Sequence, residues 1–216
     1  MIDLHTHTFF SDGVLSPSEL VYRAKKQGYA AIAITDHVDH SNIDLVVPRI
    51  AKLAKILTKS YDIVVLPGAE LTYVPPNLIE EVSFECRNFG AKVVVVHGET
   101  TEEVVPEGTN LAAVKAKVDV LAHPGYLSDE VAFLAAKNNV KIEITTKAKH
   151  GVTNKEVAQI ALKNKAKLVM NTDTHEPEHL LTEKRVIEVL LSAGLTDKFF
   201  DEMQKNSLEI VNKGDL

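Results

Sequence analysis

The first seven residues, Met1-Ile2-Asp3-Leu4-His5-Thr6-His7, combine a short apolar strand pattern with two histidines. His5 and His7 are two positions apart, so an extended backbone presents both imidazoles on the same face. Two imidazoles on one face can bind one metal ion or a close pair of ions. Taken alone, the pair is as easily an accident of a short strand as a metal site. The remaining strands must decide between these two interpretations.

Apolar strands alternate with amphipathic helices along the whole chain. Ser16-Pro17-Ser18-Glu19 is a capping box with proline at the first helical position, and Thr153-Asn154-Lys155-Glu156 is a second capping box. Continuous apolar runs are typical of parallel strands that helices cover. The expected strands are residues 2–5, 30–35, 63–70, 91–96, 118–122, 140–144 and 167–171; the expected helices are residues 17–27, 43–59, 77–89, 110–117, 128–138, 154–164, 182–193 and 197–206.

These seven strand-then-helix units predict an α/β fold with a parallel sheet. No glycine-rich phosphate-binding turn follows the first strand, which disfavours a doubly wound nucleotide-binding fold. A closed barrel of seven parallel strands, one unit short of the usual eight, is therefore the expected architecture. No linker, low-complexity tract or repeat divides the chain, so residues 1–216 are expected to form a single domain.

The composition excludes several classes of protein. The 216 residues are 45% hydrophobic and 25% charged, which suits a globular core. No apolar run approaches a membrane span and no leader pattern opens the chain, so no membrane contact and a cytoplasmic location are expected. The single cysteine excludes an internal disulfide. A net charge of −6 argues against a partner of long nucleic acid but not against an anionic substrate, because bound metal ions would dominate the local field.

Residue types that bind metals collect where the expected strands end. In a (β/α) barrel the C-terminal ends of the strands meet at one rim and carry the reactive residues. Strand ends cover roughly a tenth of such a chain, so about one of the nine histidines should fall there by chance, and six do. The ends carry His5 and His7, Asp36 and His37, Glu70, His97, His123, and Asp173 and His175.

Imidazoles combined with carboxylates suit Zn²⁺, Mn²⁺ or Fe²⁺, whereas Ca²⁺ prefers oxygen ligands alone. Nine such side chains exceed the roughly four to six ligands of one ion, so two to three divalent ions are implied, with Zn²⁺ as the first choice. Glu70 is the natural candidate for a carboxylate that bridges two ions. Clustered cations lower the pKa of a bound water and hold substrate oxygens, which suits the cleavage of phosphoesters.

The ordered set of motifs resembles the PHP (polymerase and histidinol phosphatase) family. The resemblance runs from residue 3 to residue 175 and implies a distorted (β/α)7 barrel with a trinuclear metal site. The motifs that carry it are Asp3-Leu4-His5-Thr6-His7 with Ser11-Asp12-Gly13, Thr35-Asp36-His37, Gly68-Ala69-Glu70, Val96-His97-Gly98, Ala122-His123-Pro124-Gly125 and Thr172-Asp173-Thr174-His175.

The resemblance also implies three sets of metal ligands. One ion would be held by His5, His7, Glu70 and Asp173, a second by Glu70, His97 and His123, and a third by Asp12, His37 and His175. Some members have a histidine near the position of Asp12, so the identity of the third ion stays open. Asp3 and Asp36 are expected to orient the histidines, and Glu143 either does the same or pairs with a lysine.

The implied reaction is phosphoester hydrolysis by a metal-bound hydroxide, and either His175 or a metal-bound water protonates the leaving oxygen. Lys147, in the loop after the sixth strand with Lys149 and His150, is the first choice for a substrate contact. Arg185, in the first turn of the helix after the seventh strand, is the second choice. The acidic loop that contains Glu103 is expected to be solvated, and a lid over the site is the alternative.

Three other functions compete with a phosphatase for a small phosphorylated substrate such as histidinol phosphate. The first is a phosphodiesterase or exonuclease that acts on short nucleic acid or nucleotides. The second is a related metal-dependent deoxyribonuclease barrel, which lacks the Thr-Asp-His and Asp-x-His motifs that this chain has around His37 and His175. The third is a non-catalytic subunit, such as the related protein of ribonuclease P, which has lost the ligands that this chain keeps. The sequence establishes neither the substrate nor the oligomeric state.

Overall fold

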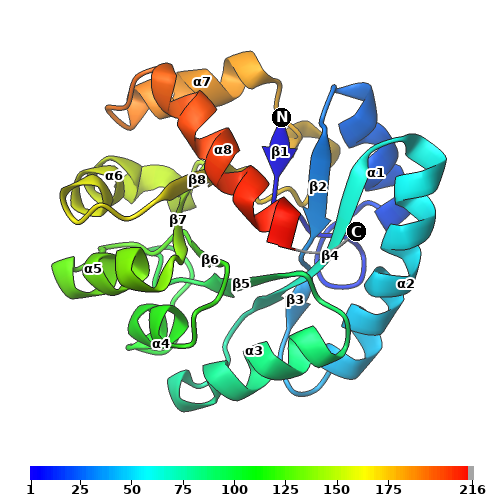
Figure 1. Cartoon of the computed structure of the whole chain (residues 1–216), viewed down its shortest axis with the longest axis horizontal. Coiled ribbons are helices and arrows are strands. Elements are labelled where there is room, and N and C mark those ends of the chain that lie inside the picture. The colour runs from blue at the N-terminus through cyan, green and yellow to red at the C-terminus, as the bar shows by residue number, and fades with distance from the viewer. Residues whose placement is uncertain (214–216) are drawn as a thin grey trace.

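Seven parallel strands follow one another around a nearly closed barrel (Figure 1). The computed structural model describes residues 1–213, and the predicted domain of residues 1–216 also includes three residues outside that range. Each strand pairs in parallel with the next along the path, which confirms the predicted seven-stranded parallel barrel. The strands on the path are β1 (Ile2–Asp3), β2 (Ala31–Ile34), β4 (Val64–Leu71), β5 (Val93–His97), β6 (Val120–Ala122), β7 (Lys141–Thr145) and β8 (Leu168–Asn171).

Helices cover the outside of the strands. They are α1 (Pro17–Lys26), α2 (Ile43–Tyr61), α3 (Ile79–Asn88), α4 (Thr109–Lys115), α5 (Asp129–Asn138), α6 (Asn154–Lys163), α7 (Glu183–Ser192) and α8 (Lys198–Lys213), with 3₁₀ turns η1 (Pro76–Leu78), η2 (His150–Thr153) and η3 (Pro177–His179). Within the described residues, no helix has both the length and the apolar character that a membrane span requires.

The two predicted capping boxes have different outcomes. The Ser16 side chain accepts a hydrogen bond from the Glu19 backbone N–H at 3.2 Å, and Pro17 begins α1, so the first capping box is confirmed. The second is wrong, because η2 runs directly into α6. Thr153 therefore has backbone angles of φ −99° and ψ 2° instead of the extended conformation that a cap needs, and its side chain makes no capping bond.

Two boundaries and one strand also differ from the sequence prediction. β1 ends at Asp3, because the next backbone N–H, that of Leu4, donates to the side chain of Asn171 at 2.9 Å instead of to a strand. A short strand that was not predicted, β3 (His37–Val38), pairs with β4 beside the main path. Helix α8 continues to Lys213, seven residues beyond its predicted end at residue 206.

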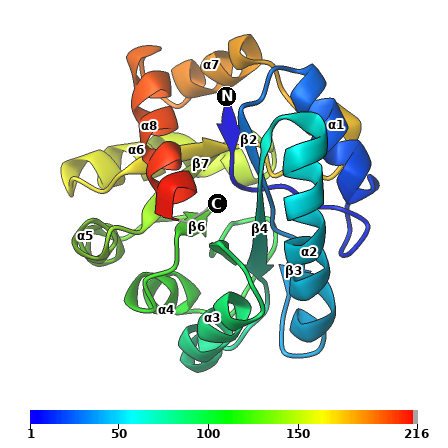
Figure 2. The same cartoon turned by 45° about the vertical axis from the view of Figure 1, so that its right-hand side comes forward.

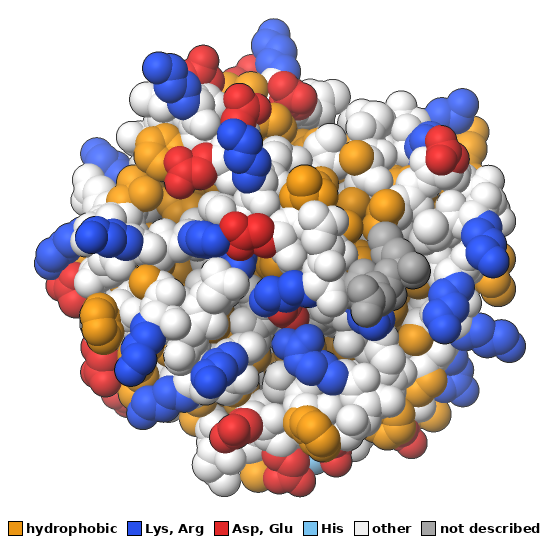
Figure 3. Space-filling view, viewed as in Figure 1, with side chains coloured by type: hydrophobic (Ala, Val, Ile, Leu, Met, Phe, Trp, Pro, Cys, Tyr) orange, Lys and Arg blue, Asp and Glu red, His pale blue; other side chains and the backbone are white. Residues whose placement is uncertain are grey.

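Helix α8 closes the barrel at the end where the strands begin. It crosses that end beside β1 and β8 (Figures 1 and 2). Its buried residues Ile210 and Val211 join the apolar cluster inside the barrel, and Asn206 donates to the Leu168 backbone oxygen at 2.8 Å. The other members of this interior cluster are Ile2, Leu4, Ala31, Ala33, Leu66, Val93, Val95, Val120, Ala122 and Val169. Figure 3 shows charged side chains of both signs over this face and hardly any histidine.

The seam between β1 and β8 is closed by side chains and one isolated bridge. Asp3 accepts hydrogen bonds from the Thr172 backbone N–H at 3.2 Å and from its hydroxyl at 2.6 Å. Three residues further on, Thr6 forms an isolated parallel bridge with Thr174. The predicted metal ligands His5 and Asp173 lie between these contacts, so closing the barrel also brings the two ends of the chain together at the site.

We predict that Ile210→Ala lowers the free energy of unfolding by about 2–5 kcal/mol, because it leaves a cavity in the barrel interior. The measurement is urea unfolding followed by circular dichroism. Leu208→Ala, at a half-exposed position of the same helix, is the control and should cost about 0.5 kcal/mol or less. Equal losses for the two variants would contradict the assignment of α8 as the plug of the barrel.

Candidate metal centre

The nine predicted metal ligands lie together at the end of the barrel opposite α8. Eight come from the C-terminal ends of strands or the loops that follow them, and His37 begins β3, the short strand that follows β2. Six are buried, namely His5, His7, Glu70, His97, His123 and Asp173. The other three lie at the outer edge: Asp12, His37 and His175 have side chains that are 55%, 23% and 12% exposed.

Glu70 is at the middle of the cluster. Its Oε1 lies 3.2 Å from His5 Nε2, and its Oε2 lies 3.4 Å from His7 Nε2 and 2.9 Å from His37 Nδ1. Asp173 approaches from the last strand, with its Oδ1 at 3.2 Å from His7 Nε2. Ligand atoms of His5, His7 and Glu70 all lie within 4.8 Å of one another, which is close enough for one ion to contact all three.

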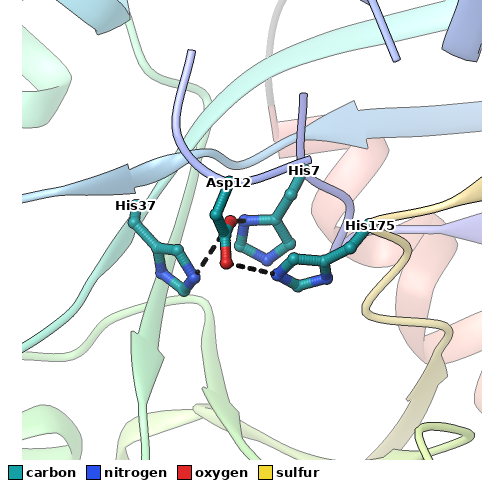
Figure 4. Close-up of side chains that lie close together, drawn as sticks. All are labelled: His7, Asp12, His37 and His175. Carbon is teal, nitrogen blue, oxygen red and sulfur yellow. Dashed lines mark ion pairs between the residues drawn. The ribbon is translucent and has the colours of Figure 1, made fainter. Parts of the chain in front are cut away.

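Asp12 organises the outer part of the cluster. Its Oδ1 lies 3.5 Å from His37 Nε2, and its Oδ2 lies 3.1 Å from His175 Nε2 (Figure 4). His7 belongs to this group as well, since all four ligand atoms lie within 4.8 Å of one another. The loop that carries Asp12 folds tightly back on itself, because a Cβ at Gly13 would lie 2.5 Å from the His7 backbone oxygen. The third predicted ligand set is thus brought together, with His7 shared between the inner and outer groups.

The second predicted set is brought together only in part. His123 Nε2 lies 3.6 Å from Glu70 Oε1, and the ligand atoms of His123, His5 and Asp173 lie within 4.8 Å of one another. The ring of His97 is 4.4 Å from that of His123, but its Nε2 faces Glu103, at 3.5 Å from Oε2. His97 is accordingly grouped with residues that the sequence analysis did not choose as ligands.

Two residues of the centre were therefore missed. Glu103 is only partly exposed and contacts His97, although its loop was predicted to be solvated. His150 was expected beside an anion, but its buried ring stacks on that of His123 at 4.6 Å. The signal that could have found Glu103 is its position in the loop that follows β5, at the rim where the other ligands lie.

Several buried polar atoms at the centre of the cluster have no hydrogen-bond partner within the described residues. They are His5 Nε2, His7 Nδ1 and Nε2, Glu70 Oε1 and Oε2, His123 Nδ1 and Glu143 Oε1. Burying polar groups without partners costs on the order of 1–3 kcal/mol each, and more when they are charged. Imidazole nitrogens and carboxylate oxygens are the ligands that Zn²⁺, Mn²⁺ and Fe²⁺ accept, so these residues fit divalent cations.

Burial and mutual charge set the protonation of the cluster. Burial opposes the charge of Glu70, but His5 and His37 outweigh it and hold the pKa of Glu70 well below its ordinary value. Burial lowers the pKa of His7 to about 3 and that of His123 well below its usual range. Ionised carboxylates and neutral imidazoles are the forms that bind metals.

His5 and His37 differ from the other imidazoles. Burial opposes their charge too, but nearby carboxylates, with Glu70 foremost, outweigh it, raising the pKa of His5 well above its usual value and that of His37 to about 10. These two rings are therefore protonated where they face the carboxylates. A bound cation would displace the ring protons.

Glu143 orients His5. Its Oε2 lies 2.9 Å from His5 Nδ1 and accepts a second hydrogen bond from the side chain of Asn171 at 2.8 Å. The bond to Nδ1 leaves Nε2 of His5 pointing at Glu70, as a ligand requires. Of the two alternatives left open for Glu143, the structure shows the contact with a histidine.

Asp36 forms hydrogen bonds with a loop and not with a histidine. It accepts hydrogen bonds from the backbone N–H and hydroxyl of Thr8 at 2.7 and 2.8 Å, and from the hydroxyl of Ser11 at 2.8 Å. These bonds fix the loop between β1 and α1 that carries Asp12. The expectation that Asp36 orients a histidine is corrected accordingly.

Backbone strain marks two of the ligands. His123 has φ 25° and Asp173 has φ 52°, which are left-handed conformations that residues other than glycine rarely adopt. Such strain, of order 1–3 kcal/mol per residue, persists only where surrounding contacts impose it and is concentrated at functional sites. His123 directly follows β6 and Asp173 lies two residues beyond the end of β8, and the strained turns direct their side chains into the cluster.

The two predicted substrate contacts lie in different surroundings. Lys147 Nζ lies 3.2 Å from Asp173 Oδ2 and 3.1 Å from His175 Nδ1, at the edge of the cluster. Arg185 lies on the exposed face of α7, where it pairs with Glu188, and the structure does not bring it to the ligands. A pocket of about 350 Å³ opens beside Asp12 and His37; it is also lined by Ser11, Val38, Asp39, Ser41, Asn42, Thr72, Tyr73 and Glu103.

Comparison with known proteins gives one family and several relatives. The PHP domain model matches residues 3–164. An uncharacterized protein of Methanocaldococcus jannaschii is 46% identical over 199 residues, which cover 91% of either chain. The DNA polymerase/3′-5′ exonuclease PolX of Bacillus subtilis is 26% identical over 197 residues, and the match covers 82% of this chain but only 35% of PolX.

Among solved structures, a chain in the cryo-EM structure of archaeal ribonuclease P with mature tRNA has the same fold. The two chains superpose with a TM-score of 0.74 at 16% identity, covering 99% of this chain and 90% of the other. At that identity the likeness concerns the fold alone.

We predict that Glu143→Gln weakens zinc binding by about 10–100-fold, the effect typical of losing a partner behind a metal-binding histidine. Glutamine keeps the size of the side chain but loses the charge that holds the Nδ1–H of His5. Competition with a chromogenic chelator measures the affinity. Glu130→Gln, at an exposed position of α5, is the control, and equal zinc affinity in the two variants would contradict the orienting role.

Proposed function

The chain belongs to the PHP domain family of metal-dependent hydrolases, and we propose that it hydrolyses the phosphoester of a small phosphorylated substrate. The observation that supports this most is the set of buried, unpartnered imidazole and carboxylate atoms around Glu70. A pocket of about 350 Å³ beside that cluster suits a small leaving group. Histidinol phosphate is one member of this class of substrate.

The cluster would hold two to three divalent ions, with Zn²⁺ preferred and Mn²⁺ or Fe²⁺ as alternatives. The inner ligands would be His5, His7, Glu70, His97, His123 and Asp173, and the outer ligands would be Asp12, His37 and His175. Bound divalent ions supply Lewis acidity to the phosphoryl oxygens and make a bound water more acidic.

Side chains of the protein have three further tasks in this proposal. The Lys147 ammonium, beside Asp173 and His175, would bind a phosphoryl oxygen and offset its charge. The pocket beside His37 would receive the leaving group. The leaving oxygen needs a proton, and the partly exposed ring of His175 and a water molecule are the two sources that fit this geometry.

A phosphodiesterase or exonuclease acting on short nucleic acid or nucleotides is the second candidate. Tyr73 favours it, because its ring is 55% exposed and lines the pocket, where it can stack on a base. The net charge of −6 disfavours long nucleic acid as a partner. A role in binding alone would not require the buried ligand-type residues around Glu70, although the fold resembles a chain of ribonuclease P.

A cytoplasmic location is part of the proposal. Cys86, the single cysteine, is a free thiol buried in α3. A chain without a disulfide is suited to a reducing compartment.

The test of the function is a substrate screen with the purified protein, loaded in turn with Zn²⁺, Mn²⁺ or Fe²⁺. The panel contains histidinol phosphate, an aryl phosphate, nucleotides, and end-labelled short DNA and RNA. We expect phosphate release from a monoester that a chelator abolishes. Turnover of the labelled oligonucleotides alone would support the second candidate. Fewer than two equivalents of metal, with turnover of no substrate, would refute both.

We predict that Lys147→Ala raises the KM for the phosphoester about 10–100-fold at unchanged metal content, the range expected for a lost charge-assisted hydrogen bond of about 1.5–3 kcal/mol. Steady-state kinetics and metal analysis measure the two quantities. Lys149→Ala, at the exposed position two residues further along the same loop, should behave like the wild type. An unchanged kcat/KM in Lys147→Ala would contradict the assigned contact.

A further inference from the structure

A groove opens on the outside of the barrel, between α2 and the turn that joins α3 to β5. Helices α2 and α3 both pack against β4 (Figures 1 and 2). The groove has a volume of about 410 Å³ and lies beside the first half of β4, whereas Glu70 is in the second half of that strand. It shares no lining residue with the pocket beside His37, so it is separate from the metal centre.

Small apolar residues form the floor of the groove. Ala51 and Ala54 face it from α2, and Val65 and Pro67 face it from β4. At one end α2 comes close to the turn after α3, because a Cβ at Gly90 would lie 3.0 Å from the Cβ of Ala51. The short side chains of the two alanines leave the space between the helix and the turn open.

Two hydrogen bonds hold the walls of the groove in place. The Val65 backbone N–H donates to the hydroxyl of Thr58 at 3.0 Å, which joins α2 to β4. The Lys92 backbone N–H donates to the carbonyl oxygen of Pro67 at 2.7 Å, which joins the turn to the same strand. The groove is therefore formed before any ligand binds, as small-molecule sites usually are.

Three exposed lysines, Lys55, Lys59 and Lys92, line the groove together with this apolar floor, and no carboxylate lines it. In residues 1–213, the ion pairs of lysine and arginine involve other side chains than these three. Lys55 and Lys59 are four residues apart on α2, so their like charges repel each other. The C-terminal end of α2 offsets only about half an elementary charge. The groove is thus clearly positive in a chain whose net charge is −6.

The positive surface continues beyond the groove. A second pocket of about 310 Å³ shares Gly90 and Lys92 with it and is also lined by Arg87, Asp119 and Lys213. Arg87 donates to Oδ2 of Asp119 at 2.9 Å, and Lys213 Nζ lies 3.7 Å from Oδ1 of the same carboxylate. Two cations around one carboxylate leave an excess of positive charge, so an anion at Lys92 meets no uncompensated negative charge from this side.

The combination of floor and rim selects the chemistry of a ligand. Cavities of about 300–1,000 Å³ with a mainly apolar lining and a few polar groups are typical of small-molecule sites. An apolar floor favours the burial of hydrocarbon, and ammonium groups form charge-assisted hydrogen bonds with carboxylates and phosphates. A neutral lipid offers only the first of these interactions, and an inorganic anion offers only the second.

We propose that this groove binds a small amphipathic anion, a short hydrocarbon body with a carboxylate or phosphate-type head group. The hydrocarbon lies on the floor between Ala51 and Val65, and the head group binds to Lys55, Lys59 and Lys92. The site goes beyond the proposed function, because none of these residues belongs to the metal centre.

Isothermal titration calorimetry of the purified full chain tests the site, with octanoate and octylphosphonate as probes. Inorganic phosphate is present throughout, so that the metal centre is occupied by another anion. Acetate and 1-octanol are the control ligands, since each keeps only one half of the proposed chemistry. We expect octanoate or octylphosphonate to bind about tenfold or more tightly than either control.

Two triple variants test the lysines. Lys55→Gln/Lys59→Gln/Lys92→Gln should bind the better probe about tenfold or more weakly than the wild type, because it loses the charge-assisted bonds. The matched control changes three exposed lysines elsewhere, and so removes the same net charge without touching the groove; it is Lys137→Gln/Lys155→Gln/Lys198→Gln. Equal affinities in the two triple variants would overturn the proposal.

Ala51→Leu tests the floor, because it fills the groove and keeps all three lysines. We expect it to lose most of the binding of octanoate, and a wild-type melting temperature without ligand shows that the variant is folded. Unchanged binding in a folded Ala51→Leu variant would contradict the proposed floor. Binding of 1-octanol as tight as that of octanoate would overturn the role of the anion. Binding of a peptide of glutamate and leucine in place of both probes would overturn the small ligand in favour of a protein partner.

Discussion

The structure depends on one buried carboxylate, that of Glu70. It is fully buried, and neither of its oxygens has a hydrogen-bond partner among the described residues, although histidine nitrogens face both of them. An isolated ion in a protein interior costs several kcal/mol, so Glu70 must be surrounded by compensating groups. Those groups come from the ends of several strands, which have to converge for the burial to be tolerated. Protonated imidazoles offer part of the compensation, and divalent cations would offer more.

One end of the barrel contributes mainly to stability, and the other end carries the residues suited to chemistry. Aliphatic side chains fill the interior up to α8, which seals one end with Ile210 and Val211. The other end is polar, and its strained ligands His123 and Asp173 need support from the rest of the fold. Closing the seam between β1 and β8 contributes to both stability and the site. The contacts of Asp3 with Thr172 lie next to the ligands that follow β1 and β8.

The sequence predicts what periodicity controls and misses what long-range contacts control. Parallel strands put their C-terminal ends at one rim, so histidines after apolar runs could be placed in one cluster without coordinates. Glu103 was missed because a loop has no periodicity, and only its contact with His97 distinguishes it from a solvated glutamate. The role of Glu143 stayed open because its partner, His5, is 138 residues away in the chain. The capping box at Thr153 failed because a 3₁₀ turn, which its motif does not reveal, precedes α6.

If metal ions compensate the charge and the unpartnered atoms around Glu70, the fold itself must depend on them. Thermal unfolding of the metal-stripped protein, in chelator and in excess Zn²⁺, measures this most directly. An ion held about a thousandfold above its dissociation constant stabilises by about 4 kcal/mol, so the melting temperature should rise by about 10 °C in zinc. Equal melting temperatures in zinc and in chelator would contradict a metal-centred barrel.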